Sequence, residues 1–194
     1  MLTKEAILSR RSCRKYQTKD VPKEIIEEII LAGKSAPTAM NRQEIKFYVI
    51  VNNIKKIQSI GNKVMENRAK AGKSGGWMEE YKKKYEVEDV IFYDAPCMIA
   101  LVADKGKSER EQYWHRMDAG IVTGNIITMA TSLGLGTVPI GIANFLNQEA
   151  VLEGIGADKE KENLLLVISL GYPVEGYKEK YVGEKPLTSF VKYV

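Results

Sequence analysis

Residues 118–133 read DAGIVTGNIITMATSL, and this segment has almost no polar face when it is wound as a helix. Apolar side chains recur on every side of it, and Gly134 stands where a helix commonly ends. Gly120 and Gly124 fall on one face, where the lack of side chains permits another helix to come close. A helix that is apolar nearly all round must be buried, so we expect this one in the core of the domain or between two subunits.

The rest of the chain predicts helices and short strands in alternation. After Pro22, isoleucines at positions 25, 26, 29 and 30 recur at helical spacing, which indicates a helix that ends near Ala32-Gly33. Short apolar runs rich in β-branched residues predict buried strands. Further helices are expected over residues 4–10, 54–70 and 148–154, and strands over 47–51, 97–102 and 164–170. This alternation, without an internal repeat, favours an α/β or α+β sandwich.

Length and composition indicate one soluble globular domain. The chain has 194 residues, of which 44% are hydrophobic and 28% charged, close to the averages for such domains. No run approaches the ~18 apolar residues of a membrane span, and the first residues lack the order of a signal peptide, so we expect a cytoplasmic protein with no membrane contact. The net charge of +4 comes from basic residues interspersed with acidic ones, which argues against nucleic acid and suits small anionic ligands. Cys13, Cys97 and the single His115 cannot supply a structural zinc site, so no metal is expected.

Two stretches differ from the rest of the domain. Residues 71–88 are polar and basic with several glycines, which predicts a surface excursion or lid within about 62–94. The tail 171–194 contains Pro173, Gly176 and Pro186, and predicts an extended C-terminal arm.

A cluster of donors follows the first expected helix. Arg10, Arg11, Ser12 and Arg14 put several charge-assisted donors in one loop, as a phosphate or other anion site requires. The alternative is a solvated basic loop.

Two more segments have the chemistry of a binding site. In the polar loop 37–43, Asn41 and Gln43 each offer donor and acceptor edges suited to a heterocycle, although an Asx-type turn is the simpler interpretation. In 134–141, glycines on both sides of Val138-Pro139-Ile140 would let the backbone approach a flat ligand. The alternative there is a helix cap followed by a turn.

In combination, these motifs resemble those of the nitroreductase-like FMN-dependent oxidoreductases. That family carries an Arg-x-Ser-x-Arg/Lys loop, a Pro-Ser/Thr-x-x-Asn-x-Gln loop and a Gly-Leu-Gly-x-x-x-x-Gly segment, and all three occur here in the same order between Arg10 and Lys185. The resemblance implies an α+β fold with a mixed central sheet flanked by helices, in a single FMN-binding domain over 1–194. It also implies a homodimer whose C-terminal arm reaches across the partner, with two FMN sites at the interface.

The resemblance also assigns roles in FMN binding. Arg10 and Ser12 would hold the phosphate and ribityl chain with help from Arg11, Arg14 would lie near the pyrimidine edge, and Lys185 would be a second phosphate contact. The other implied FMN contacts are Pro37, Thr38, Ala39 and Asn41 from the other subunit, Gln43 of the same loop, and Pro139, Ile140 and Gly141 along the ring. Glu44-Ile45 and Lys185 depart from the family, which often has proline and an aromatic residue, and arginine, at those positions.

The implied activity is hydride transfer from NAD(P)H through FMN to a nitroaromatic, quinone or related small acceptor, with no catalytic side chain. Two alternatives stay open: a reductive dehalogenase that uses polar residues among Glu79–Lys82, and a protein that stores or senses flavin.

Two other features of the sequence bear on function. A P-loop is not expected, because Gly106-Lys107-Ser108 lacks the first glycine of that motif. Cys13, among arginines, is either a reactive thiol or, more commonly, a small buried residue.

Overall fold

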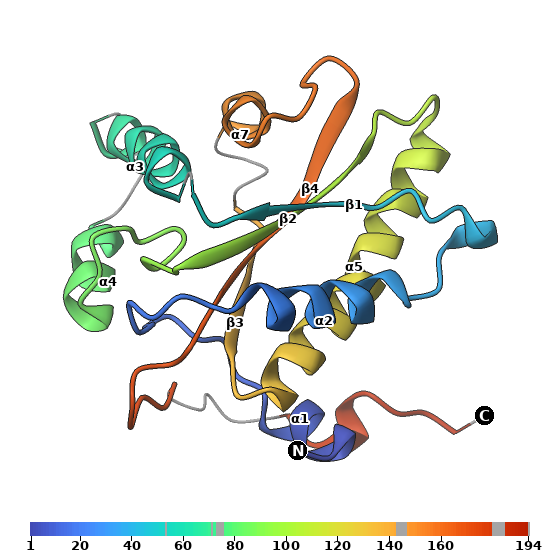
Figure 1. Cartoon of the computed structure of the whole chain (residues 1–194), viewed down its shortest axis with the longest axis horizontal. Coiled ribbons are helices and arrows are strands. Elements are labelled where there is room, and N and C mark those ends of the chain that lie inside the picture. The colour runs from blue at the N-terminus through green and yellow to red at the C-terminus, as the bar shows by residue number, and fades with distance from the viewer. Residues whose placement is uncertain (53, 71, 73–75, 143–146, 180–184, 194) are drawn as a thin grey trace.

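A four-stranded antiparallel sheet forms the centre of the computed structural model, which describes residues 1–194 apart from 53, 71, 73–75, 143–146, 180–184 and 194 (Figure 1). The strand order is β1-β2-β4-β3. The strands are β1 (Lys46–Ile50), β2 (Cys97–Asp104), β3 (Gly136–Ile140) and β4 (Glu162–Gly171). The two inner strands, β2 and β4, are mostly buried, which explains their continuous apolar sequences.

Helices cover both faces of the sheet. The helices are α1 (Thr3–Ser9), α2 (Lys23–Lys34), α3 (Ile54–Lys70), α4 (Trp77–Tyr85), α5 (Glu109–Ser132) and α7 (Gln148–Ile155), with short 3-10 turns at Ala39–Asn41 and Leu187–Ser189. Alternate residues of β2 face opposite layers, so Ile99 packs with α2 and α5 while Met98 packs with α3, α4 and α7. None of the helices in the described ranges is long and apolar enough to cross a membrane.

The expected α+β class is confirmed, and the expected helices and strands occur within a few residues of their predicted bounds, apart from the start of the long helix. Two further elements were not predicted: β3, and α4, which lies in the stretch 71–88 that was expected as a surface excursion. The helix expected over 118–133 begins earlier, at Glu109, because the Ser108 hydroxyl accepts the Glu111 N–H at 3.3 Å and caps the first turn. Strand β3 was missed, because Gly136 and Pro139 disfavour a strand. It is an edge strand, where proline does not remove a ladder hydrogen bond.

The expectation of a mixed sheet is wrong for the four strands. All three ladders are antiparallel, and the one parallel pair among the described residues is an isolated bridge between Ser12 and Thr137. A helix connects β2 to β3, and another connects β3 to β4. Such helical connections commonly join parallel strands that are neighbours in a sheet. Because β4 inserts between β2 and β3 in the opposite direction, the parallel strands are not adjacent.

The expected surface excursion over 62–94 divides into two parts. α3 and α4 lie at the surface layer, whereas the turn that follows is buried: Phe92 is inaccessible and the Asp89 carboxylate accepts the Ile91 and Phe92 N–H groups at 2.9 and 3.1 Å. That turn belongs to the core. Residues 71 and 73–75 of this stretch lie outside the described residues.

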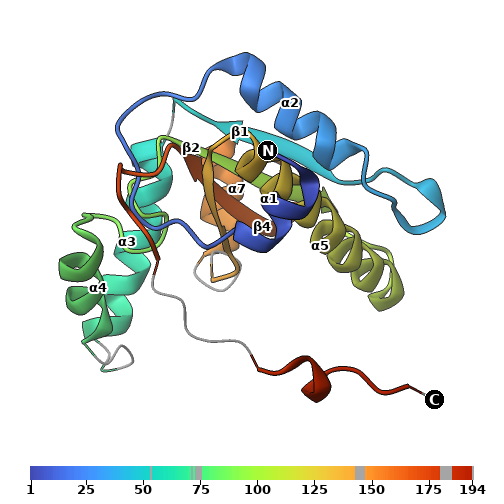
Figure 2. The same cartoon turned by 90° about the horizontal axis from the view of Figure 1, so that it is seen from below.

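The first residues of the tail after β4 pair with residues near the N-terminus of the chain, and the later ones extend away from the domain. The Gln17 N–H donates to the Tyr172 carbonyl at 2.8 Å, and Tyr16 pairs with Pro173. Residues 185–193 extend away from the sheet and helices (Figure 2), while 180–184 and 194 of the expected arm lie outside the described residues.

The contact between α2 and α5 depends on Gly33. A Cβ atom at this position would lie 2.9 Å from Ile126 Cγ1 and 3.1 Å from Phe47 Cε1. We expect Gly33→Ala to lower the free energy of unfolding by about 1–2 kcal/mol, because overpacking outweighs the gain in helix propensity. Urea unfolding followed by circular dichroism measures this, with Lys34→Ala, an exposed neighbour, as control. A stabilised Gly33→Ala protein would contradict the close crossing of α2 and α5.

Candidate functional site

The arginine-rich loop lies against the edge strand β3. The Cys13 N–H donates to the Thr137 carbonyl at 2.9 Å, next to the bridge between Ser12 and Thr137. This pairing holds the loop beside the last turn of α5, where a cavity of about 370 Å³ opens. The residues around the cavity are Ser9, Arg10, Arg11, Ser12, Cys13, Thr131, Leu135, Gly136, Pro173, Tyr177, Lys178 and Glu179.

The cavity presents positive charge to a ligand. Burial, followed by the charge of Arg11, lowers the pKa of Arg10. Within the described ranges, the Arg10 guanidinium has no hydrogen bond or ion pair, whereas Arg11 Nη1 donates to the Leu8 and Arg10 carbonyls at 2.9 and 2.8 Å. An anion with several acceptor oxygens would compensate the half-buried charge of Arg10.

Arg14 lies in a buried cluster beside this cavity. Its Nη1 is 3.1 Å from Glu179 Oε2, and its guanidinium lies over the rings of Tyr85 and Tyr93 at 5.8 and 5.7 Å. Burial opposes the charge, but Tyr93, Tyr85 and Glu179 raise the pKa of Arg14. Its buried Nε has no hydrogen-bond partner in the described part of the chain, so one donor is left for a ligand atom.

The loop 37–43 is held in a strained conformation. Met40, Asn41 and Gln43 have φ near +54° (53°, 54° and 53°), in the left-handed region that only asparagine among them tolerates well. The Ala39 N–H donates to the buried carboxylate of Asp118 at 3.0 Å, and the Gln43 N–H donates to Thr38 Oγ1 at 3.0 Å. Strain that is fixed in this way is typical of ligand-binding loops.

The third predicted segment follows β3. Pro139 is half-buried and Gly141 is exposed, and a Cβ atom at Gly141 would meet nothing within 4 Å. Ile140 is 5% exposed and packs in the core with α3 and α7. Only the backbone of Ile140 is therefore left to approach a flat ligand.

Within one chain, the predicted residues do not come together. The arginine loop lies beside Thr131 at the C-terminal end of α5, whereas the loop 37–43 is bound to Asp118 near the middle of that helix (Figure 1). Thirteen residues of helix, at ~1.5 Å each, separate these anchors by roughly 20 Å. Lys185 is exposed on the C-terminal arm and is not among the residues around the arginine cavity.

Several residues of this geometry were not predicted. Asp118 is the only charged residue in the segment 118–133, and a lone carboxylate in an apolar helix is a signal that it has a specific partner. Tyr177 and Glu179 reach the arginine cavity from the tail, and no local pattern in the sequence indicates this.

The arginines do not make Cys13 a reactive thiol. Burial raises the pKa of Cys13 to about 11 and that of Cys97 to about 12, and both are free cysteines in the interior. The neutral thiol is therefore favoured in the folded protein, as the structural interpretation of Cys13 predicts.

At pH 8 we expect iodoacetamide to alkylate both cysteines far more slowly in the folded protein than in urea, where a thiol pKa is about 8.5. The rate at Cys13 should rise about tenfold per pH unit as the thiolate fraction grows. Mass spectrometry of timed samples measures both rates. Fast labelling of folded Cys13 at pH 8 would show that the thiol is activated after all.

Known proteins share both the sequence and the fold of this chain. A protein of Methanothermobacter thermautotrophicus, provisionally named an NADH dehydrogenase/NAD(P)H nitroreductase, is 29% identical over 88% of this chain and 77% of its own length. The iodotyrosine dehalogenase 1 homolog of Caenorhabditis elegans is 24% identical over 97% of this chain and 60% of its own length. The FMN reductase [NAD(P)H] of Bacillus subtilis is 23% identical over 97% and 78%.

Among solved structures, a nitroreductase with bound FMN from Bacteroides fragilis superposes with a TM-score of 0.78 at 24% identity, over 100% of this chain and 99% of that one. At this identity the likeness shows the fold. The model of the nitroreductase family matches residues 7–172, which include the arginine loop, the strained loop and β3. The chain belongs to the nitroreductase family.

Proposed function

We propose that this protein is an FMN-dependent oxidoreductase that uses NAD(P)H to reduce small organic acceptors such as nitroaromatics or quinones. The observation that carries the proposal is the arginine cavity, where the half-buried guanidinium of Arg10 has no counter-charge among the described residues. Relatives named as an FMN reductase and as an NAD(P)H nitroreductase support the choice of cofactor and electron donor.

The residues around the cavity fit the phosphate end of FMN. Arg10 and Ser12 supply a guanidinium and a hydroxyl to the cavity. A Cβ at Gly136 would lie 2.5 Å from Cys13 Cβ, so glycine is what lets the loop sit this close to β3. Arg14, whose Nε has no partner among the described residues, and the exposed backbone of Gly141 would serve the rest of the cofactor.

The chemistry is divided between the cofactor and the chain. Bound FMN supplies the hydride transfer, so no side chain is needed as nucleophile or general acid. Arg10 and Ser12 would anchor the cofactor, and Arg14 would place positive charge beside it, which favours an anionic reduced ring. Glu179 is a positioning residue in this arrangement, because it holds the Arg14 guanidinium at 3.1 Å.

FMN binding to variants tests the cavity directly. We expect Arg10→Gln to weaken FMN binding by about tenfold or more, because it removes a charged donor to the phosphate. Riboflavin lacks the phosphate, so its affinity should change little in the same variant. Flavin fluorescence titration measures both, with Lys4→Gln, an exposed lysine on α1, as the charge-matched control. Equal losses for FMN and riboflavin would place the phosphate elsewhere.

The activity is tested on the FMN-loaded protein under anaerobic conditions. NADH or NADPH should bleach the visible flavin band rapidly, and a nitroaromatic or quinone should restore it. Slow bleaching by both donors would favour a flavin storage protein instead.

A specific feature favours reductive dehalogenation as a second candidate. A cavity of about 480 Å³ between α3 and α4 is lined by Lys82 together with Glu66, Glu79 and Glu88, which complement the carboxylate and ammonium of a free amino acid. Relatives from C. elegans and Hydra vulgaris are named as an iodotyrosine dehalogenase homolog and an iodotyrosine deiodinase. Offering 3-iodotyrosine to the reduced protein distinguishes the two candidates, since only a dehalogenase would release iodide.

We propose further that the protein works as a homodimer through the exposed face of α5. The roughly 20 Å between the arginine loop and the loop 37–43 along α5 prevents one chain from presenting both to a single FMN ring system. Tyr113, Met117 and Ile121 are 55%, 42% and 40% exposed on this helix, and a Cβ at Gly120 or Gly124 would meet nothing within 4 Å. A second α5 packed on this face would bury the apolar side chains and bring the two loops together.

The C-terminal arm supports the same assembly. Phe190 and Tyr193 are 70% and 95% exposed, and the segment 185–193 that contains them lies away from the sheet and helices (Figure 2). Beside the free edge of β1, a cavity of about 660 Å³ lined by Val49, Val51 and side chains of α2 is suited to receive such a segment from the other subunit.

Substitution on α5 tests the dimer. We expect Met117→Asp to convert the protein to monomers, because it places a charge in the proposed apolar interface. Light scattering coupled to gel filtration measures the mass. Leu31→Asp, at an exposed leucine on α2, is the matched control and should stay dimeric. A monomeric wild type, or a dimer that survives Met117→Asp, would exclude this interface.

A further inference from the structure

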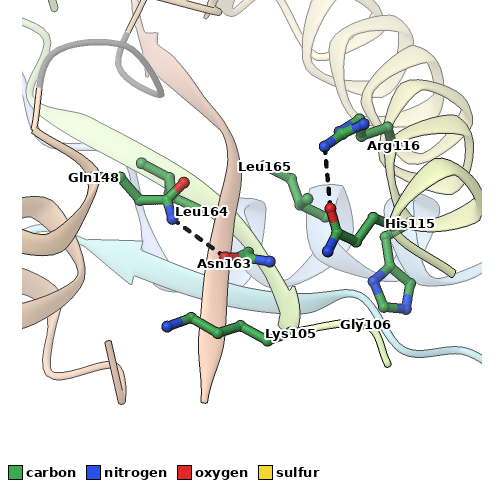
Figure 3. A pocket seen from close by; sticks show the side chains of 9 residues that line it. Lys105, Gly106, His115, Arg116, Gln148, Asn163, Leu164 and Leu165 are labelled. Atoms are coloured by element: carbon green, nitrogen blue, oxygen red, sulfur yellow. Dashed lines mark hydrogen bonds between the residues drawn. The ribbon is translucent and has the colours of Figure 1, made fainter. Parts of the chain in front are cut away.

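A cavity far from the arginine loop is built for an anion. Its volume is about 680 Å³, and it lies between the first half of α5, the start of β4, the start of α7 and the loop after β2 (Figure 3). His115 and Arg116 are about fifteen residues from Thr131 along α5, which corresponds to roughly 23 Å. Within one chain, the cavity is therefore separate from the proposed phosphate site.

The charges around this cavity have one sign. Lys105 and Arg116 extend into it from different walls, the loop after β2 and α5 (Figure 3). Neither has a carboxylate within 4 Å in the described ranges, whereas Lys46 and Lys161 nearby are paired with Asp104, Glu162 and Asp158. None of the residues that line this cavity is acidic.

Two acidic side chains beside the cavity are already engaged. Glu44 lies 3.2 Å from His115 Nε2, and Glu111 lies 3.4 Å from Arg42 while it accepts the Lys107 N–H at 2.7 Å. The N-terminus of α5, capped by Ser108, adds a further positive contribution.

Neutral groups complete the walls. Gln148 Nε2 donates to Asn163 Oδ1 at 3.3 Å, which orients both amides, and the Arg116 to Gln112 hydrogen bond is long at 3.5 Å (Figure 3). Arg116 can therefore exchange this weak contact for a stronger one with a carboxylate. Leu165, which is half-buried, provides an apolar side chain between the polar walls, whereas the Leu164 side chain is buried in the core.

We propose that this cavity binds a short organic dicarboxylate, with one carboxylate on Arg116 and the other on Lys105. Two cations on different walls suit two anionic groups joined by a short carbon chain, and Leu165 would contact that chain. The amides of Gln112, Gln148 and Asn163 recognise hydroxyl or carbonyl substituents. The cavity shares no residue with the arginine cavity of the same chain.

Calorimetric titration of the full-length protein tests the ligand class, with succinate as the probe. Succinamide, which has the same shape without charge, and inorganic phosphate, which is a single anion, are the comparison ligands at constant ionic strength. We expect succinate to bind at least tenfold more tightly than either. Binding of phosphate as tight as that of succinate, or of succinamide as tight as that of succinate, would overturn the dicarboxylate assignment.

Variants test the location. Arg116→Gln and Lys105→Gln should each weaken succinate binding by about tenfold or more, since each removes one charged contact. Arg110→Gln removes the same charge from an exposed position on α5 outside the cavity and should leave the affinity within twofold. Equal weakening by all three, or by none, would refute the site. Flavin fluorescence on the same samples reports FMN binding separately, so failure of one proposal is distinguishable from failure of the other.

Discussion

The burial of α5 between the sheet and α2 is the constraint on which the rest of the structure depends. Ile126 is inaccessible to solvent at the point where α2 crosses, and Gly33 is small enough to let the two helices meet there. Full burial of one such side chain stabilises the fold by about 1.5–3 kcal/mol, and Ala119, Val122 and Ala130 extend the same contact along the helix. The helix is thereby fixed along most of its length, and every binding feature is positioned relative to it.

A rigid helix that fixes two features at separate points along its length also keeps them apart. Asp118 holds the strained loop near the middle of α5, and Thr131 and Leu135 border the arginine cavity at its C-terminal end. Bending α5 would expose its apolar side chains to water, which is unfavourable, so the arginine loop and the loop 37–43 of one chain stay apart. Two antiparallel copies of the helix, in contrast, would place the start of one beside the end of the other. The open glycine face of α5 is the surface on which such an approach needs no rearrangement.

The sequence predicted what local patterns encode. The buried helix, α2 and the inner strands follow from hydrophobic periodicity, and the three loops follow from donors and glycines close together in the chain. Strand β3 could not be predicted from the sequence, because Gly136 and Pro139 are poor strand residues. They are tolerated here because β3 lies at the edge of the sheet. The contact between Glu179 and Arg14 and the cavity lined by Lys105 and Arg116 could not be predicted either. Both bring together segments that are far apart in the chain, and such contacts leave no periodic pattern in the sequence.

The strained loop 37–43 shows why the family motif takes the form it does. Left-handed conformations at Met40 and Gln43 cost on the order of 1 kcal/mol each, and an unrestrained loop would relax out of them. Here the Asp118 carboxylate and the Thr38 hydroxyl accept backbone N–H groups of the loop, and burial of Asp118 strengthens that hydrogen bond. Threonine at the second position of the motif is therefore needed for the shape of the loop as much as for any ligand. Because this shape is set without a ligand, the side chains of Asn41 and Gln43, which hydrogen-bond each other at 3.1 Å, would lose little entropy in binding the proposed cofactor.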